Sequence, residues 1–535
     1  MYNTRMKTII LLLTAAAFAL MLLSACSRAR FDFTFSDELT EVKAIANARR
    51  DAITRPAIDE ALRLIDLHTP GEIDVFDPIF YINCAICWAT LPHFNPTGFC
   101  THAVIHGVWE DNILLPTVYD ISQDQAIQDV ELFFAILASS YGMYHYLGGD
   151  AVFLPILSEI ISTLKTQENW DVDDFAHLLH SSLLPYVIDH HFLINNITFP
   201  RNYEVFASTM KFQKNEYGFH YNGVYVYSII LPCRPDFSQE IDTILRLSMD
   251  ETGAIFYYTP VFILCTRTGN APEVFTILYT DGTQETVPLE LVINYRRGAE
   301  PPTLEFIQGI PVVTVERMPS HLNDGRYVPN REETVQFLHF ATQLQDEPVI
   351  IIDLRYNHGG LGIVPLIWFN MLMGENIPSS YIELRIISEA RHAEIMGPPY
   401  VPSYMIGRYF RPRTRVDNYR KIQTYPPHRI VPHDQLIILL TGRRTFSTSE
   451  RMVDLALNMR NTLVIGQNTG GLYTTARNSW QPALPNSRIR FEFSVGMHIF
   501  PDGHFREGVG FAPDIWVNGC ALTAALGMIE HHVQW

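Results

Sequence analysis

The sequence predicts a multidomain α+β protein with a helical N-terminal region, a small β-rich middle domain and a C-terminal α/β domain. Three successive patterns along its 535 residues predict this order. Apolar residues recur at helical spacing up to about residue 200, and short alternating runs follow. From about residue 301, apolar runs alternate with helical patterns. Because the chain is too long for one ordinary domain, we expect segments at 26–200, 201–300 and 301–535.

The first residues resemble an export signal that ends in a bacterial lipoprotein box. Arg5 and Lys7 precede an uninterrupted apolar stretch over residues 8–23, and Leu-Ser-Ala-Cys then ends at Cys26. The resemblance implies that residues 1–25 are a signal peptide and that Cys26 carries lipid. An uncleaved N-terminal anchor is the alternative. Both interpretations place the rest of the chain outside the cytoplasm, and the first makes it a membrane-anchored lipoprotein.

The composition excludes one class of partner. The formal net charge is −18, and no run rich in lysine or arginine offsets it. Nucleic-acid binding requires a basic surface, so we expect no nucleic-acid partner.

The N-terminal region should be helical. Apolar residues at i, i+3 and i+4 predict helices over Ala57 to Leu67, Asp129 to Tyr146, Val152 to Leu164 and Asp171 to Ile188. Asp171 or Asp173 is a suitable cap for the last of these helices.

A cysteine pair in this region raises the question of a metal. Cys84 and Cys87 have a C-x-x-C spacing, and Cys100 lies nearby together with histidines 93, 102 and 106. A zinc site needs a further ligand pair at fixed spacing, which the sequence lacks. In an exported protein, a disulfide or buried thiols is the simpler interpretation. We therefore expect no metal site.

The middle segment reads as strands. Alternating runs lie at Val224 to Ile230, Ala254 to Tyr258 and Phe275 to Tyr279. Asp281-Gly282 predicts a tight turn after the last of them.

The C-terminal segment reads as an α/β layer with a partly parallel sheet. Strands are predicted at Val312 to Val315, Val349 to Leu354, Gln435 to Leu440 and Leu463 to Gly466, and a helix at Glu333 to Leu344. Glycine-rich polar turns follow two of these strands, as DLRYNHGG (353–360) and GQNTGG (466–471).

A serine stands at the start of a helical pattern after the strand that ends near Leu440. The block is TFSTSE, residues 445–450. The N-terminus of a helix offers free N–H groups and the positive end of the helix dipole, which can stabilise an oxyanion. Taken alone, the block is more typical of a helix N-cap than of a catalytic serine.

These blocks, with GVGFAPD at 508–514, resemble the tail-specific or C-terminal processing serine peptidases over about the last 235 residues. The resemblance implies a C-terminal peptidase domain of the ClpP/crotonase-like type with Ser447 as nucleophile. It also implies an oxyanion hole made of the N–H groups of Thr448 and Gly359, with Gly360 as the next choice. The middle segment stands where relatives carry a PDZ-like module. No metal or organic cofactor is implied.

The sequence departs from the best-known branch of that family, in which a lysine follows the second glycine-rich turn. Leu472 stands there, and no lysine follows it. The tricorn-core-like and retinoid-binding-protein-like branch instead takes a histidine from the N-terminal helical region and a late glutamate. That resemblance implies His191 as general base, with His190 next, and Glu507 as the orienting carboxylate.

The sequence thus predicts a serine peptidase acting on extracytoplasmic peptides or the C-terminal regions of proteins. Its partners would be a peptide or protein substrate and, through the lipid, a membrane. One alternative is a catalytically inactive peptide-binding or scaffold lipoprotein on the same fold. A metal-dependent activity built on Cys84 and Cys87 is another.

Overall fold

A computed structural model gives the structure of the chain. It describes residues 33–51, 117–144, 146–199, 203–232, 240–265, 271–292, 300–319, 321–323, 326–328, 331–387, 419–423, 430–477, 483–500, 502 and 505–535. The expected signal peptide with Cys26, the helix at 57–67 and the cluster around Cys84, Cys87 and Cys100 lie outside these residues.

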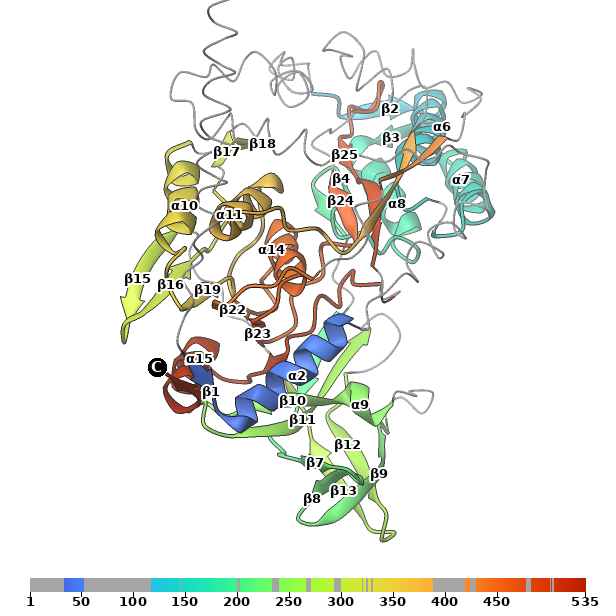
Figure 1. Ribbon diagram of the computed structural model, residues 1–535. Helices are drawn as coiled ribbons and strands as arrows, with labels where there is room; N and C mark the ends of the chain where they lie inside the picture. The colour runs from blue at the N-terminus through green and yellow to red at the C-terminus, as the bar shows by residue number, and fades with distance from the viewer. Residues whose placement is uncertain are drawn as a thin grey trace, which may run out of the picture.

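A ten-stranded mixed sheet forms the centre of the molecule (Figure 1). Its order is β14 (Glu290–Leu291), β6 (Tyr203–Ala207), β11 (Phe256–Cys265), β10 (Leu245–Met249), β27 (Ile515–Trp516), β23 (Thr462–Gly466), β22 (Leu436–Thr441), β19 (Val349–Asp353), β16 (Ile310–Thr314) and β15 (Thr303–Ile307). The strands from β10 through β27, β23, β22 and β19 to β16 pair in parallel, and the outer pairs are antiparallel. The predicted partly parallel α/β sheet is confirmed.

Helices cover both faces of this sheet. On one face lie α10 (Arg331–Gln343), α11 (Ile363–Met373) and α14 (Thr448–Leu457), and on the other lie α2 (Asp37–Asp51) and α15 (Ala521–His532) (Figure 1). Within β19, Ile350 and Ile352 join the first layer of apolar side chains, while Val349 and Ile351 join the second. Burial on both faces explains why this strand is apolar throughout.

The central sheet continues across the expected boundary at residue 300. Four of its strands, β6, β10, β11 and β14, come from the segment expected to be the middle domain. The other strands of that segment form a five-stranded sheet in the order β13 (Gln284–Pro288), β12 (Val274–Tyr279), β9 (Val224–Ile230), β8 (Gly218–Tyr221) and β7 (Gln213–Asn215), beside the short helix α9 (Ile241–Ile244). The turn predicted at Asp281-Gly282 joins the antiparallel strands β12 and β13.

The helices α6 (Gln123–Ser140), α7 (Asp150–Leu164) and α8 (Val172–Leu183) pack together beside the short strands β2 (Asp120–Ser122) and β3 (Asn169–Asp171). Helix α6 starts earlier than predicted because Ser122 and Gln125 form a capping box. Asp171 caps α8 as expected and accepts from the N–H groups of Asp173 and Asp174 at 2.9 and 3.1 Å. This helix ends before Ile188. Pro185 accounts for the early end, because it has no N–H with which to continue the helical hydrogen bonds.

C-terminal residues complete the core of this helical part. Phe491, Phe493 and Met497 are buried among the side chains of α6, α7 and α8. Strand β25 (Phe491–Glu492) pairs with β4 (Leu193–Ile194), which pairs with β5 (Ile197–Thr198). The segment just before β4 is thereby held against the C-terminal part of the chain.

Smaller sheets complete the fold. One has the order β21 (Tyr419–Gln423), β20 (Ile382–Ile387), β26 (Ser494–Ile499) and β24 (Thr475–Arg477). The two-stranded sheets in the described part of the chain are β17 (His321–Asn323) with β18 (Arg326–Val328), β1 (Thr34–Phe35) with β28 (Val533–Gln534), and β2 with β3. Among the described helices, none combines the length and the apolar character needed to cross a bilayer.

Candidate active site

Three polar turns meet at one edge of the central sheet. They follow β19, β22 and β23, which are parallel neighbours, so their carboxyl ends lie together. The N–H of Phe446, after β22, donates to the carbonyl of Asn357, after β19, at 2.9 Å. The N–H of Gly470, after β23, donates to the carbonyl of Thr445 at 2.8 Å.

Ser447 stands between the second turn and α14, at the N-terminus of that helix. Its backbone has φ 52° and ψ −116°, a conformation that a residue with a side chain rarely adopts. The N–H of Ser447 donates to Oε2 of Glu450 at 3.0 Å. The helix therefore begins with a strained serine whose backbone is fixed by a carboxylate of the same helix.

The glycines of the first turn lie against this serine. Gly359 has φ 91°, and a Cβ added to it would come within 2.9 Å of Cβ of Ser447 and 3.1 Å of the nitrogen of Thr448. Its own N–H donates to Oδ1 of Asn357 at 2.8 Å. The hydroxyl of Thr448 donates to the carbonyl of Gly360 at 2.7 Å. Within the described residues, the N–H groups of Gly360 and Thr448 donate no hydrogen bond.

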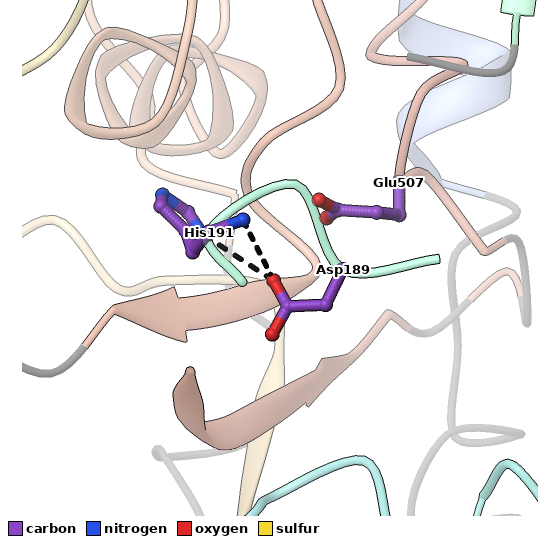
Figure 2. Close-up of side chains that lie close together, drawn as sticks. All are labelled: Asp189, His191 and Glu507. Carbon is purple, nitrogen blue, oxygen red and sulfur yellow. Dashed lines mark hydrogen bonds and ion pairs between the residues drawn. The ribbon is translucent and has the colours of Figure 1, made fainter. Parts of the chain in front are cut away.

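The segment with the two histidines follows α8, and the buried carboxylate of Asp189 anchors it. Oδ1 of Asp189 accepts the N–H of His191 at 2.9 Å (Figure 2). The same oxygen accepts the hydroxyl of Ser494 at 3.0 Å. Oδ2 of Asp189 accepts the N–H of Ser494, also at 3.0 Å. Asp189 thereby joins the backbone of His191 to Ser494 at the start of β26.

Both histidines connect to Glu507, whose side chain is buried. The hydroxyl of Thr475 lies 2.9 Å from Nδ1 of His191 and donates to Oε2 of Glu507 at 3.4 Å. Oε1 of Glu507 accepts the N–H of His190 at 3.1 Å and lies 3.3 Å from its Nδ1. Glu507 is thus linked to His190 directly and to His191 through a hydroxyl.

Burial strongly affects the acidic groups here. Burial, followed by the nearby charge of Glu507, raises the pKa of Asp189 to about 6. Burial and the same two carboxylates raise the pKa of Tyr141, whose hydroxyl is fully enclosed. Both shifts show that ionisable groups lie close together here in a poorly solvated place, where their charged forms are disfavoured.

The grouping of Asp189, His191 and Glu507 could hold a cation, because one ligand atom from each lies within 4.8 Å of the others. The hydroxyl of Thr475, however, lies at hydrogen-bond distance from both His191 and Glu507. The oxygens of Asp189 already accept three hydrogen bonds. These hydrogen bonds already engage an atom of each of the three side chains, and we propose no metal there.

The structure therefore gathers the residues predicted from sequence into two groups. Gly359, Gly360 and Thr448 lie at Ser447, while His190 and His191 lie at Glu507. No hydrogen bond joins Ser447 to either histidine in the described part of the chain. Catalytic hydrogen bonds are often long in proteins without substrate, so this does not separate the groups functionally.

Three residues of this site are not among those predicted from the sequence: Asp189, Glu450 and Thr475. In the sequence, Glu450 stands out only as the last residue of the TFSTSE block. Asp189 directly precedes the histidine pair, and a short acidic side chain next to a candidate base is a usable signal. Thr475 has no sequence signal, because its role depends on where β24 lies.

Comparison with known proteins gives one family match. Residues 312–517 match the model of peptidase family S41. Several solved structures are similar to the chain. One is mature CPAF complexed with lactacystin, with 15% sequence identity and a TM-score of 0.38; the match covers 76% of this chain and 97% of that chain. A lipoprotein from Streptococcus agalactiae has 14% identity, with 78% and 99% coverage and TM-score 0.35. The photosystem II D1 C-terminal processing protease has 11% identity, with 74% and 92% coverage and TM-score 0.33. No curated protein matches the chain.

Proposed function

Because the chain carries a peptidase family S41 domain and is a serine-type peptidase, we propose that Ser447 is its nucleophile and His191 its general base. The observation that carries this proposal is the contact between Gly359 and Ser447 at the N-terminus of α14. Acyl transfer requires a positioned nucleophile and N–H donors for the oxyanion. The strained Ser447, with the glycine turn beside it, meets both needs.

His191 is the better of the two histidines for the base. A hydroxyl joins its Nδ1 to Glu507, so the carboxylate fixes the ring and stabilises its charged form. The ring of His190 lies against backbone as well as Glu507: its Nδ1 is 3.3 Å from Oε1 of Glu507 and 3.4 Å from the carbonyl of Gly471. Its Cε1 would lie 3.2 Å from a Cβ added to Gly508. We assign His190 to holding Glu507, which accepts its N–H.

The reaction follows from these roles. The hydroxyl of Ser447 attacks the scissile carbonyl as Nε2 of His191 takes its proton, and the N–H groups of Thr448 and Gly360 stabilise the oxyanion. His191 returns the proton to the leaving amine, which leaves an acyl group on Ser447. Water, activated by the same imidazole, then releases the acid. Gly360 replaces Gly359 as the favoured donor here, because the N–H of Gly359 is engaged by Asn357.

The substrates that we propose are extracytoplasmic peptides or the C-terminal regions of proteins. The PDZ-like identity of the segment 201–300 stays a prediction. An inactive peptide-binding or scaffold lipoprotein on this fold is the alternative.

Hydrolysis of a fluorogenic peptide library tests the nucleophile. Ser447→Ala should lose at least about a thousandfold in kcat/KM, since the attacking atom is gone. Ser449→Ala is the matched control, because the buried hydroxyl of Ser449 only donates to the carbonyls of Asn357 and Phe446. Activity that survives in Ser447→Ala at the wild-type level would remove the assignment, and a wild type that cleaves nothing would favour the scaffold alternative.

The lipid anchor has its own test. We propose that the chain is a bacterial lipoprotein held outside the cytoplasm through Cys26. Cys26→Ser should move the protein from the membrane fraction to the soluble fraction and abolish incorporation of radiolabelled fatty acid, because only a cysteine thiol accepts the lipid. Unchanged membrane recovery without label in the wild type would instead support an uncleaved anchor.

A further inference from the structure

We infer that Glu450 is a positioning residue that couples the nucleophile to the turn carrying Glu507. The inference rests on the proposed function and adds a residue that the mechanism above does not use. Glu450 is completely buried on the first turn of α14.

The carboxylate of Glu450 accepts four hydrogen bonds from two segments. Oε2 accepts the N–H of Ser447 at 3.0 Å and the N–H of Leu472 at 2.7 Å. Oε1 accepts the N–H of Gly471 at 3.0 Å and the hydroxyl of Thr469 at 2.5 Å. The strained backbone of Ser447 and the turn after β23 are thereby held by one side chain.

The turn after β23 leads on to Glu507 through a single residue. The carbonyl of Gly471 accepts the N–H of Gly508 at 2.7 Å, and Gly508 directly follows Glu507. Gly471 has φ 79°, and a Cβ there would come within 2.5 Å of the nitrogen of Gly508, so the two backbones are in direct contact. The peptide groups of Gly471 therefore join Glu450 on one side to the Glu507 turn on the other.

This arrangement also gives a structural role to position 472. The side chain of Leu472 supplies no base, but its backbone N–H belongs to the set that binds Glu450. Backbone N–H groups that converge on the carboxylate of Glu450 thus set how far Ser447 lies from the turn that carries Glu507.

Glu450→Gln tests this inference, because the amide keeps the shape but replaces one acceptor oxygen with a donor. That donor must face either the N–H groups of Ser447 and Leu472 or the N–H of Gly471 and the hydroxyl of Thr469. We expect kcat to fall about a hundredfold with KM changed by less than about threefold, since positioning affects the reaction more than binding. Fluorophosphonate labelling of Ser447 should slow in parallel.

Asp454→Asn is the matched control. Asp454 lies one turn later on α14, is equally buried, and accepts from Ser380 rather than from the active-site turns. Both variants should lower the midpoint of thermal unfolding, but kcat of folded Asp454→Asn should stay within about threefold of wild type. Equal kcat in the two variants would overturn the inference.

A second pair of variants covers the case in which Glu450→Gln does not fold. Thr469→Val removes one donor to Glu450 and should lower kcat about tenfold, while Thr469→Ser retains the hydroxyl and should restore it. If Thr469→Val keeps full activity, Glu450 does not position the site. Failure of the proposed function is distinguishable, because wild type itself would then show no labelling at Ser447.

Discussion

Replacing His191 by alanine should lower kcat/KM for peptide hydrolysis by about a thousandfold or more, because the hydroxyl of Ser447 loses its proton acceptor. The expected loss lies in kcat, since the imidazole acts on the reacting atoms and not on the rest of the peptide. Steady-state kinetics with a fluorogenic peptide measure this directly.

His190→Ala is the control that separates the two neighbouring histidines. It deletes an imidazole next to Glu507 but leaves the His191–Thr475–Glu507 chain intact. We expect a loss of about tenfold, because only the support of Glu507 is weakened. The reverse order of effects would make His190 the base and Glu507 its direct partner.

Gly359→Ala should lower kcat about a hundredfold or more, because the added methyl group has no room beside the nucleophile. It would lie 2.9 Å from both the carbonyl oxygen of Phe446 and Cβ of Ser447, at a φ that disfavours alanine. The turn and Ser447 must move apart, and the oxyanion donors then miss the developing charge. Kinetics and fluorophosphonate labelling both report this loss.

Gly374→Ala is the control: it introduces the same unfavourable positive φ for alanine as Gly359→Ala, but its methyl group meets no neighbouring atom. Gly374 follows α11 with φ 65°, and nothing lies within 4 Å of its added Cβ. It should cost about 1 kcal/mol of stability and leave kcat unchanged. If both alanine variants keep wild-type kcat, the contact between Gly359 and Ser447 has no catalytic role.

Parts of the fold were predictable where burial dictates the residue type. Strands β19 and β22 face apolar layers on both sides, so they appear in the sequence as continuous apolar runs. The end of α8 was missed although Pro185 marks it, and the start of α6 was missed because polar residues cap it. Which strands pair was not predictable at all, because alternation identifies faces and not neighbours. The central sheet therefore takes in β6, β10, β11 and β14 from a segment that reads as separate.

The active site also has a part that the sequence predicts and a part that it does not. The meeting of the three turns follows from parallel strands, and the glycines there have a sequence signal. Thr475 and Glu450 act through hydrogen bonds between distant segments. In the sequence, Glu450 is indistinguishable from the acidic residue of an ordinary capping box.

The most direct measurement is the rate and the site of fluorophosphonate labelling in the wild type and in His191→Ala. Peptide mapping by mass spectrometry should find the adduct on Ser447 of the wild type. The same adduct should form at least about a hundred times more slowly when His191 is alanine, since the hydroxyl is no longer activated. An adduct on another serine, or equal rates in the two proteins, would contradict a peptidase built on Ser447 and His191.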